Sequence, residues 1–325
     1  MTEATVQPTP PEVSPEAADA AWRRVQLARH PQRPRTLSLV AQIFDDFVEL
    51  HGDRAFRDDP AIVGGPARLD GRAVMVVGHQ KGTDTESNIF RNFGSPMPEG
   101  FRKAQRLMRL ADRVGLPLVT FLDTAGAFPG PAAEERGQAE AIASSIQLMT
   151  GLRVPIVVVI VGEGGSGGAL AIGVGDEVLA LENAVYSVIS PEGCAAILWR
   201  SADAAPLAAA AMKMTAAEQH ELGIVDGVID EPGDGAHTDL PATATAIKRA
   251  VLGSLARLER MAPDDLRARR YTRLRAIGTV LEGEAEALRV GPPSLTARLG
   301  RLLGLPGAVP APAGMDDEDL DEEGA

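Results

Sequence analysis

Two largely apolar runs without polar alternation constrain the fold of this chain more than any other feature. They read LPLVTFLD over residues 116–123 and VPIVVVIV over residues 154–161. A strand with one face in water alternates apolar and polar residues, so runs of this length without such alternation indicate strands that are buried on both faces. A segment with helical periodicity lies between them. This alternation predicts an α/β fold with a parallel sheet covered on both sides.

Flanking segments extend the same pattern. Apolar residues at helical spacing predict a helix over residues 36–50, a second over 98–115 and a third over 132–150. Residues 61–69 and 73–78 are typical of two strands joined by a tight turn at Asp70-Gly71. We expect a β-hairpin at the start of the sheet.

Composition limits the possible partners and compartments. The chain has 45 acidic and 32 basic residues, a formal charge of −13, which argues against nucleic acid as its main partner. The longest apolar run is far shorter than the roughly 20 residues of a membrane span, so no membrane association is expected. Cys194 has no second cysteine to pair with, and residues 1–20 lack the layout of a signal peptide. A cytoplasmic location is expected.

The two ends of the chain differ in composition from its middle. Residues 1–18 are rich in Pro, Thr, Glu and Ala and predict a disordered lead-in. Residues 291–325 contain a short amphipathic piece, a Pro/Ala/Gly linker and an acidic run, which predict a linker and a disordered tail. The folded domain is therefore expected over residues 19–290.

Five glycines follow the second apolar run, between Gly162 and Gly168. They contain the spacing G-x-G-x-x-G, with Glu182 about twenty residues after the first glycine, which is the outline of a dinucleotide site. The helix that such a site needs is short here, because two further glycines interrupt it at Gly173 and Gly175. No Lys-Ser or Lys-Thr follows, which excludes a Walker-type phosphate loop. Dinucleotide binding is thus a weak interpretation.

A different chemistry explains these glycines better. A strand that leads through glycines into a helix presents unpaired backbone N–H groups, and residues without side chains let a ligand oxygen approach them. Another turn, residues 124–127, follows the strand at 116–123. Neighbouring parallel strands open ligand sites at their carboxyl ends, so the two turns are expected to meet. We predict that they form an oxyanion hole.

Longer motifs point to a family. They include HGDRAF, NFGSPMPEGFRKAQRLM, FLDTAGAFPG, AEERGQAEAIA, GEGGSGGALAIGVGD and YSVISPEGCAAILWRSADAAPLAAAAMKMTA, spread in order over residues 25–275. With these motifs the chain resembles the alpha subunits of bacterial acetyl-CoA carboxylase carboxyltransferases. The resemblance implies a crotonase/ClpP-like superhelix of stacked ββα units with flanking helices, in place of a doubly wound sheet.

The resemblance also implies site residues. It places the oxyanion donors at Gly167 and Gly168, with Gly126 and Ala127 as a second choice. Substrate or biotin contacts are expected from the following residues: Gly164, Gly165, Phe128, Lys81 and Arg91. The two cations among them suit the phosphates of coenzyme A or a carrier protein. His79 either lines the site or is a hydrogen-bonded structural histidine.

Partners and substrates are implied in the same way. In the family, a zinc-bearing beta subunit joins the alpha subunit in an alpha2beta2 heterotetramer. The tetramer works with biotin carboxyl carrier protein and biotin carboxylase in an ATP-dependent enzyme of fatty acid synthesis. Carboxybiotin and acetyl-CoA are its substrates, malonyl-CoA is its product, and no cofactor is expected on this chain. One cysteine cannot reproduce a four-cysteine zinc site, so no metal is expected either.

Two other functions stay open. A stand-alone crotonase-type CoA enzyme, such as a hydratase, would place paired glutamates in its site, and no such acid–base pair stands beside the glycine turns. A non-catalytic scaffold subunit of an acyl-CoA carboxylase would need the fold without the oxyanion donors. Activity measured with and without a beta subunit separates these hypotheses from the transferase.

Overall fold

The computed structural model describes residues 11–278. Within this range the strands form one seven-stranded sheet in the order β1-β2-β3-β4-β5-β7, and β6 pairs with the end of β4. The first pair is antiparallel and the others are parallel, as predicted for the central strands. The strands are β1 (Ile62–Leu69), β2 (Arg72–His79), β3 (Leu118–Thr124), β4 (Ile156–Gly165), β5 (Glu177–Leu181), β6 (Val185–Ser187) and β7 (Gly227–Ile229).

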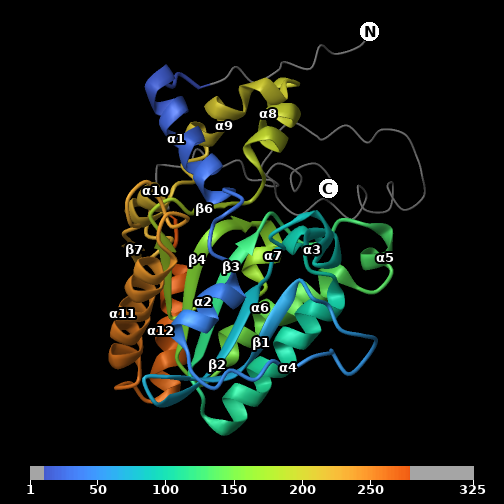
Figure 1. The fold of residues 1–325 in the computed structure, drawn as a ribbon, viewed down its shortest axis with the longest axis vertical. Helices are drawn as coiled ribbons and strands as arrows, with labels where there is room; N and C mark the ends of the chain where they lie inside the picture. The colour runs from blue at the N-terminus through green and yellow to red at the C-terminus, as the bar shows by residue number, and fades with distance from the viewer. Residues whose placement is uncertain (1–10, 279–325) are drawn as a thin grey trace, which may run out of the picture. The chain divides into compact units, whose positions relative to one another are not determined.

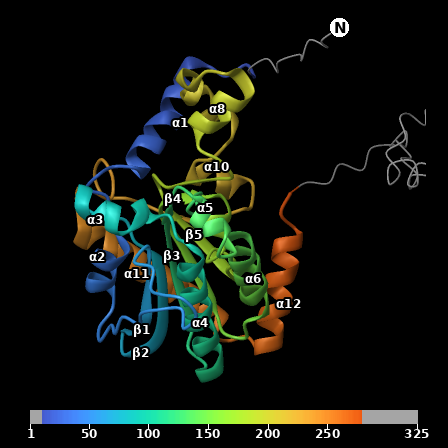
Figure 2. The same ribbon diagram turned by 90° about the vertical axis from the view of Figure 1, so that its right-hand side faces the viewer.

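Helices cover both faces of this sheet (Figures 1 and 2). The helices are α1 (Pro15–Ala28), α2 (Thr36–Ile43), α3 (Thr85–Phe90), η1 (Asn92–Gly94), α4 (Pro98–Val114), α5 (Pro131–Glu134), α6 (Gln138–Gly151), α7 (Ser166–Leu170), α8 (Pro191–Trp199), η2 (Ala202–Ala204), α9 (Ala205–Ala211), α10 (Ala216–Glu221), α11 (Leu240–Leu258) and α12 (Pro263–Arg275). Helices α2 and α11 pack together on one face, while α4 and α6 pack on the other, with α12 beside α6. None of the helices among residues 11–278 combines the length and hydropathy that a bilayer span requires.

A third group of helices lies beyond the ends of the strands. Helix α1 packs against α9, and α9 packs against α8, so the three form a small bundle above the sheet in Figure 1. The bundle sits at the carboxyl ends of β3 and β4, where the glycine turns begin. The fold therefore leaves these turns between the sheet and a helical cap.

The central strands are buried as the apolar runs predict. Every residue of β3 is buried, and so are the first seven residues of β4. The hairpin is confirmed as well: Asp70 and Gly71 have φ values of 49° and 76°, the left-handed pair that a two-residue hairpin turn requires. Helix α4 begins at Pro98 and is capped by Gly115 with φ 75°, close to the predicted bounds.

The helix predicted over residues 36–50 is wrong in its second half. Helix α2 ends at Ile43, and the chain then runs extended beside β1. The Val48 and Leu50 amides donate to the carbonyls of Pro66 and Gly64 at 3.0 and 2.9 Å. An uncovered edge strand supplies hydrogen-bond partners that local helical spacing does not reveal, so pairing with β1 replaces the helix.

The single helix predicted over residues 132–150 is also wrong. Helix α5 ends at Glu134, and α6 begins at Gln138 after Gly137, which has φ 79°. A left-handed residue cannot continue an α-helix, and glycine adopts that conformation at little cost. The break turns the chain before α6 packs against α4.

The predicted domain division lies only partly within the described residues. The lead-in predicted for residues 1–18 overlaps α1, whose N-cap Ser14 accepts a hydrogen bond from the Ala17 amide at 3.2 Å. Residues 1–10 lie outside the described range, and so do residues 279–290 of the predicted domain and the predicted tail at 291–325. The limits at 18 and 290 stay predictions.

A buried ion pair fastens α12 to the sheet. The Arg270 guanidinium donates to both carboxylate oxygens of Asp176, at 2.9 and 2.7 Å, and both side chains are fully buried. Its remaining protons reach the carbonyls of Met149, Leu152 and Val154 at 2.7 to 3.1 Å. One side chain of α12 thus holds the end of α6 and the segment between α6 and β4.

We expect Arg270→Met to lower the free energy of unfolding by about 3–5 kcal/mol, because it leaves the buried Asp176 carboxylate without its cationic partner and with the Ile156 amide as its remaining donor. Urea unfolding followed by circular dichroism measures this loss. Arg267→Met on the same helix is the control, since Arg267 forms only an exposed pair with Asp264 and should cost less than about 1 kcal/mol. Equal losses in the two variants would contradict a structural role for the buried pair.

Candidate functional site

The two glycine turns lie against each other. Strands β3 and β4 are parallel neighbours: β3 runs directly into the first turn, residues 124–127, and β4 runs into the second turn, which begins at Ser166. A Cβ atom added to Gly168 would lie 2.5 Å from the Ala127 nitrogen and 2.6 Å from the Gly126 carbonyl carbon. The structure thus brings together Gly167 and Gly168 with Gly126 and Ala127, although their catalytic role stays a prediction.

Several positions in this region have no room for a side chain. A Cβ on Gly165 would approach the Ala125 carbonyl oxygen to 2.2 Å, and one on Gly162 would approach the Asp123 carboxylate to 2.4 Å. At Gly164 the obstacle is the Tyr186 ring, also at 2.4 Å. These contacts are all closer than real Cβ atoms come, so the glycines serve the packing of β4 against its neighbours.

The G-x-G-x-x-G spacing does not form a phosphate-binding turn. Its first two glycines, Gly162 and Gly164, are still inside β4, and the turn begins only at Ser166. Helix α7 then has five residues, too short for the helix of a dinucleotide unit. The geometry argues against a dinucleotide site, in agreement with the interrupted helix expected from the sequence.

A network of buried charges lies behind the turns. The Lys81 ammonium, just after β2, contacts the carboxylates of Asp123 at 2.8 Å and Glu163 at 2.9 Å. Arg35 joins Asp123 at 2.8 Å, and Arg29 joins Glu163 at 2.6 Å. The carboxyl ends of three neighbouring strands are therefore tied together by ion pairs, one strand end for each member of the Lys81–Asp123–Glu163 triad.

Each charge in the triad stabilises the ionised form of its partners. Burial alone would raise the pKa of Asp123, but Lys81 and Arg35 hold it below its usual range. Burial would also raise the pKa of Glu163, but Lys81 and Arg29 outweigh it and hold this pKa below its usual range. The pKa of Lys81 is raised because the two carboxylates outweigh its desolvation. All three side chains stay charged near neutral pH.

The triad coincides with an irregularity in the sheet. The pairing of β3 with β4 shifts between Leu122 and Thr124, so Thr124 pairs with Gly164 while Leu122 pairs with Ile160. Asp123 lies in this bulge, and its carboxylate accepts a hydrogen bond from the Glu163 amide at 3.2 Å. Bulges locally disrupt strand pairing, and this one lies where both strands approach their turns.

His79 holds the second turn from the other side. Its Nε2 lies 3.2 Å from the Gly168 carbonyl oxygen, and the side chain is fully buried at the end of β2. Burial lowers the pKa of His79 to about 4, so the neutral ring donates this hydrogen bond. Of the two roles considered from the sequence, the hydrogen-bonded structural histidine is the one observed.

The other predicted contact residues lie around the turns in different ways. Lys81 points into the buried triad. Arg91, between α3 and η1, donates to the Pro60 carbonyl at 2.8 Å. Phe128 is half-buried after the first turn, and its amide donates to the Pro96 carbonyl at 3.0 Å. Contacts of these residues and of Gly164 and Gly165 with substrate stay predictions.

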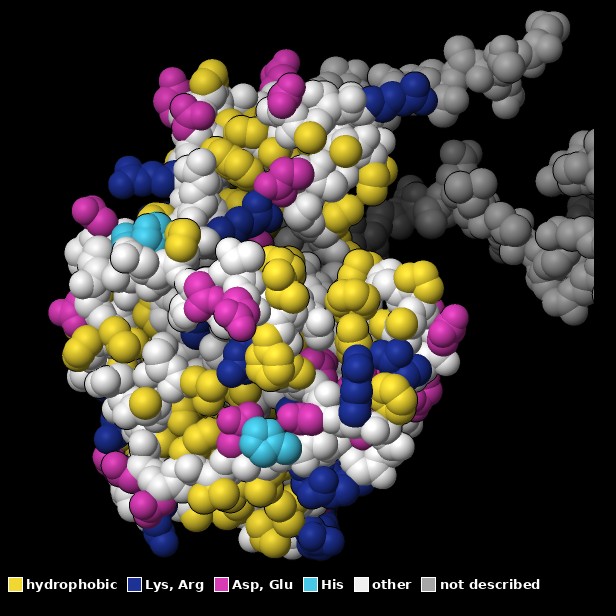
Figure 3. Space-filling view, turned by 45° about the vertical axis from the view of Figure 1, so that its right-hand side comes forward, with side chains coloured by type: hydrophobic (Ala, Val, Ile, Leu, Met, Phe, Trp, Pro, Cys, Tyr) yellow, Lys and Arg dark blue, Asp and Glu magenta, His cyan; other side chains and the backbone are white. Residues whose placement is uncertain are grey.

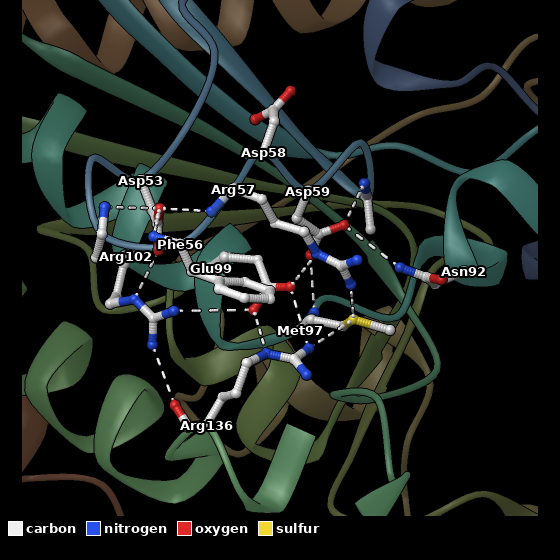
Figure 4. Close-up of polar contacts among 12 residues, drawn as sticks. Asp53, Phe56, Arg57, Asp58, Asp59, Asn92, Met97, Glu99, Arg102 and Arg136 are labelled. Atoms are coloured by element: carbon white, nitrogen blue, oxygen red, sulfur yellow. Dashed lines mark hydrogen bonds and ion pairs between the residues drawn. The ribbon is translucent and has the colours of Figure 1, made fainter. Parts of the chain in front are cut away.

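A second cluster of charges escaped the sequence analysis (Figure 4). The buried Glu99 carboxylate at the start of α4 pairs with Arg57 at 2.7 Å and with Arg136 at 3.1 Å. The Arg136 guanidinium also lies 4.9 Å from the centre of the exposed Phe56 ring. These contacts fasten the loop before β1 and the turn between α5 and α6 to one helix start. No spacing signals such pairs, because their partners are far apart in sequence.

An apolar cleft opens beside the second turn. Its volume is about 520 Å³, and Ser166 and Gly167 form one edge. The other lining residues are largely apolar: Leu170, Tyr186, Val188, Met212 and Ile224, with Ser187 and Gln219 as polar members. Volumes of this size suit a small molecule or its apolar part.

Comparison with known proteins identifies the family. The model of the family "Acetyl co-enzyme A carboxylase carboxyltransferase-like" matches residues 17–278. The chain belongs to this family. Two relatives named acetyl-coenzyme A carboxylase carboxyl transferase subunit alpha are similar over most of their length. The Thermus thermophilus protein is 60% identical, and the match covers 80% of this chain and 84% of that protein. The Edwardsiella ictaluri protein is 59% identical, and the match covers 79% of this chain and 81% of that protein.

Solved structures of other carboxyltransferases share the fold. Transcarboxylase 12S gives a TM-score of 0.54 with 22% identity over 75% of this chain, and the beta subunit of Pseudomonas aeruginosa geranyl-CoA carboxylase gives 0.54 with 19% over 87%. The chain spans 47% and 49% of these two longer chains. The crotonase-type α/β fold and the family resemblance expected from the sequence are both confirmed.

In this carboxyltransferase-family chain, we expect Gly168→Ala to lower the free energy of unfolding by about 1–3 kcal/mol, because the added methyl group must separate the two turns. Thermal and urea unfolding measure the change. Gly151→Ala is the matched control, since nothing lies within 4 Å of the added Cβ there. An unchanged stability for Gly168→Ala would show that the turns are not packed as described.

Acidification should destabilise the protein through His79. Its pKa is near 6.5 when unfolded and about 4 when folded, so between these values the unfolded state binds the extra proton. Stability therefore falls as the pH drops from 7 to 4, by about 3 kcal/mol from this group. In His79→Gln, the difference in unfolding free energy between the two pH values should shrink by that amount. An identical pH dependence in both proteins would refute the buried neutral histidine.

Proposed function

We propose that this chain is the alpha subunit of an acetyl-CoA carboxylase carboxyltransferase. It transfers the carboxyl group of carboxybiotin, carried on a biotin carboxyl carrier protein, to acetyl-CoA and thereby forms malonyl-CoA. The names of relatives that are about 60% identical over most of their length support this activity. The reaction begins fatty acid synthesis in the cytoplasm, and ATP is used by the biotin carboxylase that recharges the carrier.

The observation that carries this proposal is the apolar cleft against the glycine turn. A bicyclic ring with a polar ureido end requires an apolar pocket that stops at hydrogen-bond donors. Leu170, Val188 and Met212 supply apolar walls, and the cleft reaches the backbone at Ser166 and Gly167. We infer that biotin enters this cleft with its ureido oxygen toward the N–H groups of the turn.

The chemistry needs fixed donors more than a protein nucleophile. Negative charge develops on the ureido oxygen when the carboxyl group leaves, and acetyl-CoA must become an enolate before it attacks. Backbone N–H groups held in place stabilise such charge without reorganising during the reaction. In our proposal Gly167 and Gly168 serve the ureido oxygen, with Gly126 and Ala127 as the second possible donors. The released biotin nitrogen takes the proton from acetyl-CoA.

The thioester side of the site belongs to a partner in this proposal. A zinc-bearing beta subunit contributes the second oxyanion hole, and two copies of each subunit form an alpha2beta2 heterotetramer. Among residues 11–278 no group of three or more His, Cys, Asp or Glu side chains is placed to hold a metal ion. We assign the zinc of the complex to the beta subunit.

The reverse reaction tests the proposal. Malonyl-CoA-dependent carboxylation of free biocytin is measured with the full chain alone and then mixed with the beta subunit of the same organism. We expect activity only in the mixture, because each subunit supplies one oxyanion hole. Activity of the chain alone would indicate a stand-alone CoA enzyme. A stable but inactive complex would indicate a scaffold subunit.

A variant then tests the cleft. Val188 is 75% exposed on its rim, so Val188→Trp should fold normally and fill part of the cleft. We expect the KM for biocytin to rise about tenfold, a loss of roughly 1.4 kcal/mol of binding, with a smaller change in kcat. Val114→Trp, at the end of α4, is the control. An unchanged KM for biocytin in Val188→Trp would show that biotin does not bind in this cleft.

A further inference from the structure

A second cleft, unrelated to the glycine turns, lies on the exposed side of α4. Its volume is about 500 Å³, and arginines dominate its lining: Arg54, Arg102, Arg106, Arg109 and Arg113. Four of them follow the α4 spacing i, i+4, i+7, i+11, which places them along one side of the helix. The fifth comes from the loop before β1. Basic side chains gather toward the lower right of the face shown in Figure 3. We call this feature the arginine cleft.

Most of this positive charge has no carboxylate partner. Within residues 11–278, only Arg102 of the five pairs with carboxylates, at 2.8 Å from Asp53 and 3.8 Å from Glu99. Three of the other arginines donate hydrogen bonds to uncharged oxygens. Arg54 and Arg106 each donate to the His51 carbonyl at 3.1 Å. Arg109 donates to the Gln105 amide oxygen at 3.2 Å. The cleft thus keeps a net positive charge in a chain whose formal charge is −13.

The loop that carries Arg54 is held in an unfavourable conformation. Arg54 has φ 66°, a left-handed value that costs free energy for a residue with a side chain. The neighbouring Asp53 carboxylate stabilises it by accepting hydrogen bonds from the Ala55, Phe56 and Arg57 amides at 2.8 to 3.1 Å (Figure 4). The same carboxylate holds Arg102. The Arg54 backbone and the Arg102 side chain are therefore positioned before any ligand arrives.

Like charges held this close repel one another. Desolvation and the Arg54 guanidinium lower the pKa of Arg106, and together they outweigh the nearby Asp58 carboxylate, which acts to raise it. An anion in the cleft would offset the repulsion between Arg54 and Arg106. Guanidinium groups bind phosphate oxygens in a bidentate manner, and several of them in one cleft match several phosphate charges.

We propose that the arginine cleft binds a small ligand that carries two or more phosphate groups. The volume of the cleft suits a small molecule, and the net negative charge of the chain opposes long nucleic acids. Two sources share this chemistry: free nucleoside polyphosphates, and the phosphorylated nucleotide end of coenzyme A. The site does not depend on the proposed transferase activity.

Isothermal titration of the full chain with inorganic tripolyphosphate, at about 50 mM salt, tests the proposal. We expect one saturable site with a Kd below about 1 mM, weakened by added salt. The double variant Arg109→Glu with Arg113→Glu should weaken binding at least about tenfold, because two attractive charges become repulsive. Both residues are exposed, so the variant should fold, which its circular dichroism spectrum and unfolding curve check.

The matched control changes the net charge equally at another place. Arg249 and Arg260 are exposed on and just after α11, and their double change to Glu should leave binding within about twofold. Absence of saturable binding, or equal weakening in both double variants, would overturn the proposal. Titrations with ATP and with adenosine 3′,5′-bisphosphate identify the source: tighter ATP binding supports a free nucleotide, and tighter bisphosphate binding supports coenzyme A.

Discussion

The buried Lys81 ammonium connects the ends of three strands, and the geometry of the site depends on it. It reaches the carboxylates of Asp123 and Glu163, which belong to the two strands that carry the glycine turns. Removing these three charges from water is costly, and close contacts with Arg29 and Arg35 help to offset that cost. Ion pairs of this kind specify distance, so they fix how far apart the two turns begin.

The glycines allow the close packing of the strand ends that the ion pairs hold together. Because Gly162 has no side chain, the Asp123 carboxylate can lie against β4, and because Gly168 has none, the two turns can touch. The His79 ring then fixes the Gly168 carbonyl through one hydrogen bond. Backbone donors held in this way need little rearrangement when charge develops near them, as the oxyanion site that we propose requires.

The sequence predicted the parts of the structure that local patterns control. Apolar runs without polar alternation located β3 and β4, a two-residue turn signal located the hairpin, and the glycines that follow the two runs located the glycine turns. Pairing over long sequence distances was not predictable: helix α2 stops early because residues 45–50 pair with β1, and Lys81 is buried because its two partners lie on other strands. The Glu99 cluster was missed for the same reason, since a single sequence does not show which arginine meets which carboxylate.

The extended segment after α2 has a consequence for the solubility of the folded chain. An edge strand with free amides and carbonyls is a template on which other chains can add strands and aggregate. The amides of Asp45, Val48 and Leu50 occupy carbonyls of β1 along its outer side, and Pro66 within β1 has no amide hydrogen to offer. The segment that ended the predicted helix early thus protects this border of the sheet from self-association.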